Sequence, residues 1–208
     1  MVKWKSLVRV QLTAPTIGKQ AMDHFFDSIH GWWWGPDHQW YNESVDRAPD
    51  GAHMVEVGCF KGRSTAQLVV NVINSGKNIR VDCVDNWLGS EEHRAGGIAE
   101  DMDAVNGTLF EAFTANMAPV AGYYNAVRMD SVSAAATYED ATLDWVFIDA
   151  SHDYDNVVAD INAWLPKVKS GGVISGHDWF YPPVSQAVTD TLGNVNYLMD
   201  RVWYKTKE

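Results

Sequence analysis

The sequence predicts an α/β protein built on a doubly wound, mostly parallel seven-stranded sheet that ends in an antiparallel hairpin. Short apolar runs alternate with stretches of helical period along most of the chain, which is typical of repeated strand–helix units. A glycine-rich turn follows the first apolar run, and two later runs end in acidic residues. With 208 residues the chain is long enough for one well-filled domain and too short for two.

Five strand–helix units and a hairpin account for the chain beyond residue 52. The predicted strands are His53–Val57, Ile79–Val84, Ala126–Met129, Leu143–Ile148, Gly172–Ser175, Val195–Met199 and Val202–Thr206. The predicted helices are Ser64–Asn74, Thr108–Met117, Ser131–Ala136, Asn156–Val168 and Val184–Thr191. In such a Rossmann-like sheet the ligand lies beyond the carboxyl ends of the strands, where the strand order reverses.

Two segments depart from this pattern. Residues 1–47 are predicted to be an aromatic-rich helical extension of the core, residues 48–208, within one compact domain. The aromatic cluster in residues 20–47 is either a cap or dimer surface packed on the core, or a wall of the substrate site. The polar, acidic residues 88–104 are either a solvated loop or a lid over the sheet edge.

Composition narrows the classes of partner. The net charge of −11 disfavours nucleic acid and favours a small-molecule substrate. No apolar run reaches the roughly 18 residues of a membrane span, and residues 1–5 lack an apolar signal core, so we expect a cytoplasmic protein that does not enter a membrane. Cys59 and Cys83 are expected to be reduced, buried thiols rather than a disulfide or metal pair.

The first turn carries the pattern of a nucleotide-cofactor pocket. Glu56 lies near the end of a buried strand, and Gly58 and Gly62 follow in a turn that opens onto a helix. Glycines let the backbone approach a ligand closely, and the first N–H groups of the helix point into the turn. Phe60 replaces the central glycine of the dinucleotide fingerprint, which argues against a pyrophosphate lying across this turn.

The spacing Glu-x-Gly-x-x-x-Gly-x-Ser over residues 56–64 resembles motif I of class I S-adenosylmethionine-dependent methyltransferases. The likeness is to the metal-dependent small-molecule O-methyltransferases related to the catechol and macrocin enzymes, and the run Val84–Ser90 resembles their second motif. It extends from about residue 33 to residue 205. The resemblance implies that the methionine side of the cofactor site includes Glu56, Gly58, Phe60, Gly62 and Ser64, and that Asn86 and Trp87 also belong to the cofactor site.

Polar residues after the next two strands complete the predicted cofactor site. Asp85 ends the second strand, where its two oxygens can accept hydrogen bonds from both ribose hydroxyls. Asp82 is the alternative, although strand alternation places it less well for the rim. Asp130 and Ser131 follow the third strand, where they can cap a helix and are also expected to meet the adenine.

A metal site is predicted at the ends of the fourth and fifth strands. Asp149 follows one, and His177 and Asp178 follow the other, so their side chains emerge at the same rim and suit Mg²⁺. The resembling enzymes carry an acidic residue in place of His177, which leaves Mn²⁺, Fe²⁺ and Zn²⁺ open. Asp149 could instead orient the cofactor or the methyl acceptor without metal.

His152 is the predicted general base. It lies three residues beyond Asp149, where the catechol-type enzymes carry a lysine base, and imidazole titrates near neutral pH. The alternative is a histidine that bonds to the backbone or to Asp153 at a helix start.

These features predict metal-assisted O-methylation of a small-molecule hydroxyl, with S-adenosylmethionine as cofactor. The alternatives are a cephalosporin-hydroxylase-like enzyme on the same fold, a noncatalytic S-adenosylmethionine-binding module, and, more distantly, a nicotinamide oxidoreductase. A homodimer is a further hypothesis.

Overall fold

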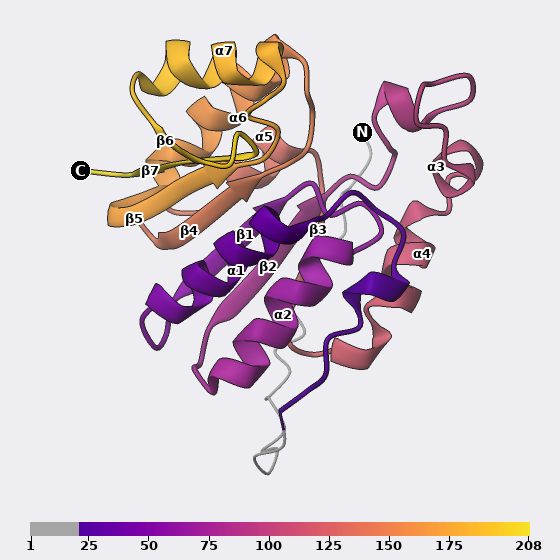
Figure 1. Ribbon diagram of the computed structural model, residues 1–208, viewed down its shortest axis with the longest axis horizontal. Coiled ribbons are helices and arrows are strands. Elements are labelled where there is room, and N and C mark those ends of the chain that lie inside the picture. The colour runs from indigo at the N-terminus through magenta and orange to yellow at the C-terminus, as the bar shows by residue number, and fades with distance from the viewer. Residues whose placement is uncertain (1–20) are drawn as a thin grey trace, which may run out of the picture.

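The computed structural model describes residues 21–208, so residues 1–20 of the predicted extension lie outside the described part. One sheet runs through it in the order β3-β2-β1-β4-β5-β7-β6 (Figure 1). Its strands are β1 (His53–Val57), β2 (Arg80–Asp85), β3 (Asn125–Arg128), β4 (Leu143–Ile148), β5 (Val168–Gly176), β6 (Asn196–Leu198) and β7 (Val202–Thr206). Strands β1 to β5 are parallel, and β7 is antiparallel to both of its neighbours, which confirms the predicted fold class.

The strand order reverses at β1. Strand β2 pairs with one edge of β1 and β4 with the other, and the chain then builds outward on each side. The carboxyl ends of β1, β2 and β4 therefore lie side by side, at the position where doubly wound sheets bind ligands.

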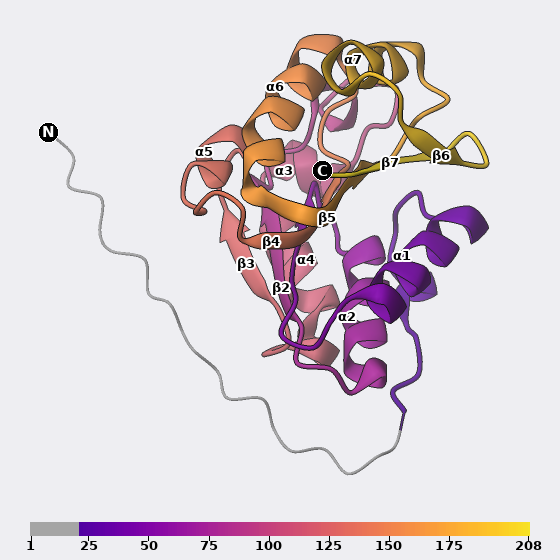
Figure 2. The ribbon, with the colours of Figure 1, turned by 90° about the vertical axis from the view of Figure 1, so that its left-hand side faces the viewer.

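Helices cover both faces of the sheet (Figures 1 and 2). One layer holds α1 (Gly35–Arg47), α2 (Arg63–Ser75) and α4 (Leu109–Asn116), and the other holds α5 (Ser131–Ala135), α6 (Tyr154–Trp164) and α7 (Pro182–Leu192). Alternation along β1 serves both layers, because Met54 packs in the first core and Val55 in the second. Short elements complete the chain: η1 (Phe26–Ser28), η2 (Glu91–His93), α3 (Met102–Asn106), η3 (Ala118–Val120) and η4 (Leu165–Lys167).

No helix within residues 21–208 combines the length and the apolarity needed to cross a membrane.

The aromatic segment before β1 packs largely into the first core. Trp33, Trp40 and Tyr41 are buried, and Trp33 Nε1 donates a hydrogen bond to Gln67 of α2 at 2.6 Å. Trp32 is different, since 44% of its surface is exposed. Most of the cluster therefore holds α1 against the body, whereas the rings of Trp32 and Trp34, the latter 50% exposed, are left for other contacts.

Element boundaries differ from the prediction mainly around β5. Helix α6 ends at Trp164, before η4, because Pro166 has no backbone N–H to continue the helical pattern. Strand β5 begins at Val168, which pairs with Leu143, and the register shifts before Trp145 pairs with Val173. An irregularity of this kind leaves little periodicity in the sequence, so the start of the strand was placed too late.

Asp82 is a buried structural carboxylate on β2. Its side chain is fully buried and accepts hydrogen bonds from His53 Nε2 at 2.8 Å, Arg80 Nη2 at 2.8 Å and Asn125 Nδ2 at 2.7 Å. Burial alone would raise the pKa of Asp82, but these donors outweigh burial and lower it to about 2. Asp82 thus joins neighbouring strands away from the ligand rim, which removes it as the alternative to Asp85.

The Asp82 cluster predicts a stability change in acid. The pKa of Asp82 lies below its ordinary 3.8, so its contribution is fully present above about pH 4 and is lost as the pH falls toward 2. We expect Asp82→Asn to lower the free energy of unfolding by about 2 kcal/mol near neutral pH. Denaturant unfolding from pH 7 to 2 should show this difference shrinking, whereas Asp140→Asn, which removes an exposed partner of Lys167, should change little. A difference that does not vary with pH would contradict the assignment.

Candidate active site

A cavity of about 1010 Å³ opens at the carboxyl edge of β1, β2, β3 and β4. Its size suits a nucleoside-containing cofactor with room for a second small molecule. The walls come from the β1–α2 turn, the segment after β2, the start of α5 and the β4–α6 loop. Of the predicted cofactor residues, those that line it are Gly58, Phe60, Asp85, Asn86, Asp130, Ser131 and Asp149.

Gly58 allows the β1–α2 turn to pass directly over the end of β4. Its φ is +89°, and an added Cβ would lie 2.0 Å from the backbone oxygen of Asp149. Only glycine fits such an approach in this conformation. The cofactor turn and the strand end that carries Asp149 are consequently in direct backbone contact.

Asp85 fastens the same turn to the end of β2. One carboxylate oxygen accepts from the backbone N–H groups of Cys59 and Phe60, both at 2.9 Å, and the other accepts from Trp87 N at 2.6 Å. Burial raises the pKa of Asp85, and these three donors oppose that effect. The contact of Asp85 with the ribose stays a prediction. The structure shows a second role for Asp85, which is to hold the β1–α2 turn in shape.

Four predicted cofactor residues lie behind the turn instead of lining the cavity. Glu56 is fully buried and accepts from Tyr41 OH at 2.9 Å, Ser64 Oγ at 2.5 Å and Thr65 Oγ1 at 2.5 Å. Burial raises the pKa of Glu56 to about 7 against these three donors. Glu56 and Ser64 are therefore bonded to each other, which corrects the expected direct contacts with the methionine portion.

Gly62 and Trp87 support the turn from the other side. Gly62 is the N-cap of α2 and faces Met117 and Phe113, whereas Trp87 is buried and its Nε1 donates to Phe60 O at 2.9 Å. Gly62 and Trp87 were predicted to belong to the cofactor site, but the adjacent aromatic core encloses them and they do not line the cavity.

The far end of the cavity is formed by the start of α5. Asp130 Oδ1 accepts from Ser133 N at 2.9 Å and caps this short helix, as predicted. The Ser131 hydroxyl accepts from Trp164 Nε1 at 2.9 Å. Asn86, on the β2 side, uses its Oδ1 to accept from Leu88 N at 2.8 Å, so its loop is also shaped by a local side-chain contact.

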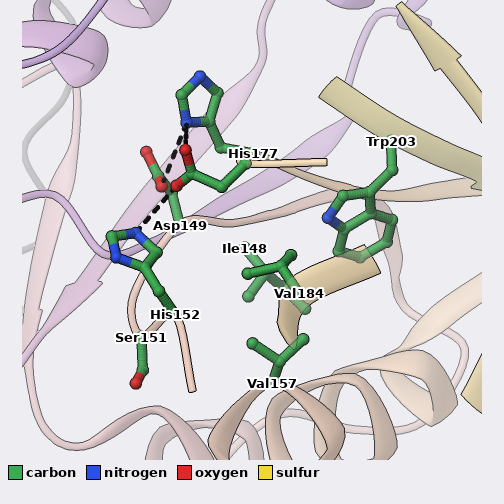
Figure 3. Close-up of a pocket in the computed structure, with 9 residues that line it drawn as sticks. Ile148, Asp149, Ser151, His152, Val157, His177, Val184 and Trp203 are labelled. Atoms are coloured by element: carbon green, nitrogen blue, oxygen red, sulfur yellow. Dashed lines mark ion pairs between the residues drawn. The ribbon is translucent and has the colours of Figure 1, made fainter. Parts of the chain in front are cut away.

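Asp149, His152 and Asp178 form a candidate metal cluster beside the cavity. One donor atom from each lies within 4.8 Å of the other two, and Figure 3 shows His152 and Asp149 on one side of an apolar floor that includes Ile148 and Trp203. Two carboxylates and an imidazole can bind a divalent ion, with Mg²⁺ favouring the oxygens and transition metals accepting all three donors. Burial raises the pKa of Asp149 to about 6.

His152 is held between two carboxylates. Its Nε2 lies 2.9 Å from Asp178 Oδ2, and its Nδ1 lies 3.1 Å from Glu92 Oε1. The bond to Asp178 is the main cause that raises the pKa of His152 to about 9, against the opposing effect of burial. Without a bound cation, the imidazole is therefore protonated at neutral pH. It can act as a base only after the neighbouring negative charge has been neutralised.

His177 lies between the two predicted aspartate ligands and two further charged residues. Its Nδ1 lies 3.2 Å from Asp178 Oδ1 and 3.7 Å from Asp149 Oδ1, and Figure 3 shows the ring next to Asp149. Its Nε2 faces Asp37 Oδ1 at 3.2 Å, and Arg201 Nη2 lies 3.2 Å from the same ring nitrogen. Burial opposes protonation, yet the surrounding carboxylates, with Asp149 the largest contributor, raise the pKa of His177 to about 10. His177 therefore lies beside both aspartates and stays a predicted ligand, while His152 is a further candidate ligand.

Sequence reasoning missed three charged residues of this site. Glu92 belongs to the polar segment 88–104, where a lid was considered but no contact to His152 was foreseen. Asp37 and Arg201 come from α1 and from the β6–β7 connection, and Arg201 Nε donates to Asp37 at 3.0 Å. Neither residue stands in a motif, so only the folded arrangement reveals them.

Ion pairs also fasten the segment 88–104 to the cofactor turn. Lys61 Nζ lies 2.7 Å from Asp101 and 2.6 Å from Asp103, and the Lys61 side chain is only 12% exposed. The segment is thus held at one end by the turn and at Glu92 by His152.

Residues 55–179 match a family model described as a methyltransferase domain. The match covers more than half of the chain, and the chain belongs to this family. The strand order and the cavity beside the first turn agree with the class I methyltransferase fold.

Known proteins resemble the chain at low identity. The uncharacterized protein y4gI of Sinorhizobium fredii (strain NBRC 101917 / NGR234) is 26% identical over 159 residues, which cover 76% of this chain and only 16% of that protein. The chain thus spans a small part of the length of this curated relative.

Solved methyltransferases share the fold. The O-methyltransferase NovP has a TM-score of 0.62 at 15% identity, over 83% of this chain and 79% of that chain. An O-methyltransferase from Thermotoga maritima gives 0.59 at 12%, over 86% and 67%. The methyltransferase PaMTH1 of Podospora anserina, solved with S-adenosylhomocysteine, gives 0.57 at 12%, over 82% and 77%.

The Gly58 contact predicts a loss of cofactor binding that a matched glycine does not share. Gly58→Ala should push the turn off the backbone of Asp149 and weaken S-adenosylhomocysteine binding by roughly a hundredfold or more in calorimetry. Gly51→Ala is the control, because Gly51 has a similar φ of +79° but no atom within 4 Å of an added Cβ. Equal affinities in the two variants would contradict the proposed close approach.

Asp85 should matter with and without cofactor. Asp85→Ala leaves the N–H groups of Cys59, Phe60 and Trp87 without their acceptor, so we expect a lower melting temperature in the ligand-free protein. Affinity for S-adenosylhomocysteine should also fall by roughly tenfold to a hundredfold. Differential scanning fluorimetry and calorimetry measure the two effects. If only the affinity changes, the turn does not depend on Asp85.

Proposed function

We propose that this protein is a divalent-metal-assisted O-methyltransferase that methylates a hydroxyl group of a small molecule. The observation that carries the proposal is the cluster of Asp149, His152 and Asp178 at the edge of the cofactor cavity. Both the cluster and the cavity include Asp149, so a hydroxyl bound at the cluster would lie next to the cofactor.

The residues of the cluster have separable roles in this proposal. When bound, S-adenosylmethionine supplies an electrophilic methyl group, and a divalent ion would supply the Lewis acidity that makes a hydroxyl easier to deprotonate. Asp149 and Asp178 would hold the ion, and His177 would keep Asp178 in place through its 3.2 Å contact. His152 would either complete the ligand set or take the proton of the hydroxyl, since its ring reaches the same space.

Aromatic rings from three segments would form the wall for the methyl acceptor. The His93 ring stacks on Phe60 with 4.8 Å between centroids, and the half-exposed Trp32 ring stacks on His93 at 5.5 Å. Phe60 and His93 line the cavity. This arrangement supports the acceptor-wall interpretation for Trp32, while its neighbours Trp33 and Trp40 are buried in the core.

The charge of the cavity favours some methyl acceptors over others. Its lining includes the carboxylates of Asp85, Glu91, Glu92, Asp130, Asp149, Asp153 and Asp160, and Arg94 is the only lysine or arginine among the described lining residues. An uncharged or cationic ring compound with a hydroxyl group fits this field better than a phosphorylated one or a nucleic acid. The cytoplasmic location and the homodimer remain predictions.

Formation of S-adenosylhomocysteine tests the proposal. The protein, S-adenosylmethionine and Mg²⁺ would be incubated with a fractionated small-molecule extract, and products would be followed by mass spectrometry. We expect a fraction that gains one methyl group while S-adenosylhomocysteine accumulates, and we expect chelator to stop both changes. Tight cofactor binding without turnover in every fraction would favour the noncatalytic alternative, and full turnover in excess chelator would contradict the metal.

Metal binding by the two aspartates gives a prediction that needs no methyl acceptor, and only the base role of His152 requires one. Asp149→Asn and Asp178→Asn should each weaken Mn²⁺ binding by roughly tenfold or more, measured by electron paramagnetic resonance in protein saturated with S-adenosylhomocysteine. Asp153→Asn is the control, because Asp153 also lines the cavity but is outside the cluster. His152→Ala separates its two roles: weaker Mn²⁺ binding identifies a ligand, and unchanged binding with lost turnover identifies a base. Unchanged affinity in both aspartate variants would contradict the site.

A further inference from the structure

Asp37 is a fully buried carboxylate of α1 that lies next to the predicted metal ligand His177. Its Oδ1 lies 3.2 Å from His177 Nε2. Arg201 Nε and Nη2 donate to Asp37 at 3.0 and 3.2 Å, and Trp34 N donates to it at 3.0 Å. The Asp37 side chain therefore cannot turn away from the imidazole without leaving these donors unpaired in a poorly hydrated part of the protein.

His177 presents its other ring nitrogen to the two aspartates of the candidate metal cluster. Its Nδ1 faces the carboxylates of Asp178 and Asp149 at 3.2 and 3.7 Å (Figure 3). The side chain of His177 is only 4% exposed, and its backbone N–H donates to Ile148 O at 3.1 Å at the end of β4. One enclosed imidazole thus connects the buried Asp37 to both aspartates.

The position of the hydrogen on this ring decides which nitrogen can bind an ion. A nitrogen that binds a metal ion carries no hydrogen, so a neutral imidazole that binds through Nδ1 has its hydrogen on Nε2. In that tautomer Nε2–H donates to Asp37, the kind of carboxylate contact that orients metal-binding histidines. In the other tautomer the Nε2 lone pair would face the Asp37 carboxylate and be repelled. Arg201 Nη2 also lies 3.2 Å from Nε2, but it can donate to the second oxygen of Asp37 instead.

We propose that Asp37, held by Arg201, is a positioning residue that sets His177 to bind the divalent ion through Nδ1. His177 would then do more than keep Asp178 in place, because its Nδ1 would be a third donor to the ion. Asp37 itself would not touch the ion. Two distant segments, α1 and the β6–β7 connection, would in this way complete the metal site. The inference rests on the metal of the proposed function and is independent of the methyl acceptor.

A spectroscopic signal of Mn²⁺ tests the ligand role of His177. The protein would be labelled with ¹⁵N-histidine and saturated with S-adenosylhomocysteine and Mn²⁺. Pulsed electron paramagnetic resonance should then detect histidine nitrogen bound to the ion. We expect His177→Ala to lose a nitrogen signal that His152→Ala retains.

Mn²⁺ affinity in a double-mutant cycle tests the positioning role of Asp37. Asp37→Asn should weaken Mn²⁺ binding by roughly tenfold or more when His177 is present, and by roughly twofold or less when His177 is already alanine. Asp82→Asn is the matched control. Asp82 is also a buried carboxylate that contacts a histidine Nε2 and an arginine, but it lies away from the ligand rim. We expect Asp82→Asn to lower stability and leave Mn²⁺ affinity unchanged.

The outcomes separate this inference from a structural role and from the proposed function. If Asp37→Asn weakens Mn²⁺ binding by the same factor with and without His177, its effect is one of charge or packing alone and the inference is wrong. A nitrogen signal that stays complete in His177→Ala also overturns it, even if Asp37→Asn fails to fold. If Mn²⁺ binds and no histidine nitrogen is detected, this inference falls while the two aspartate ligands stand. If Mn²⁺ does not bind the wild-type protein, the proposed metal and this inference fall together.

Discussion

The site depends on one close contact, the passage of the β1–α2 turn over the end of β4. Gly58 permits it because no side chain separates the turn from the backbone of Asp149, and Asp149 N donates to Val57 O at 2.7 Å beside it. The strand that carries a cluster carboxylate is thereby fixed against the turn that borders the cofactor. Methyl transfer requires the two reactants in line, and in the proposed function this rigid joint between their binding sites would provide that alignment.

Around this joint, each carboxylate of the candidate metal cluster contacts a histidine side chain that also contacts a second carboxylate. Asp178 faces both His152 and His177, and His177 in turn faces Asp37, which Arg201 also contacts. The cationic groups of this network, His152, His177 and Arg201, come from segments that are distant in the sequence. Their charges therefore balance those of the aspartates only in the folded protein. Desolvation makes each group costly alone, and mutual pairing offsets that cost.

The sequence predicted the elements with a regular hydrophobic period and the residues at the carboxyl ends of the strands. The doubly wound seven-stranded sheet, the glycine turn and the approximate position of Asp149 beside Asp178 followed from periodicity and from the rule that parallel strands end at one rim. The directions of the Glu56 and His177 side chains could not be predicted in this way. Glu56 turned inward because Tyr41, fifteen residues earlier, supplies a donor from α1. His177 turned toward Arg201 for a similar reason, since such partners depend on tertiary packing that a local motif does not record.

The two attachments of the segment 88–104 have a consequence for turnover. Lys61 holds one part through Asp101 and Asp103, and Glu92 holds another through His152. Because Glu92 meets the cluster while the same segment lines the cofactor cavity, a movement of this segment that opened the cavity would also remove a carboxylate from His152. We therefore expect departure of the spent cofactor to accelerate with ionic strength, because salt weakens the contacts that keep this segment closed.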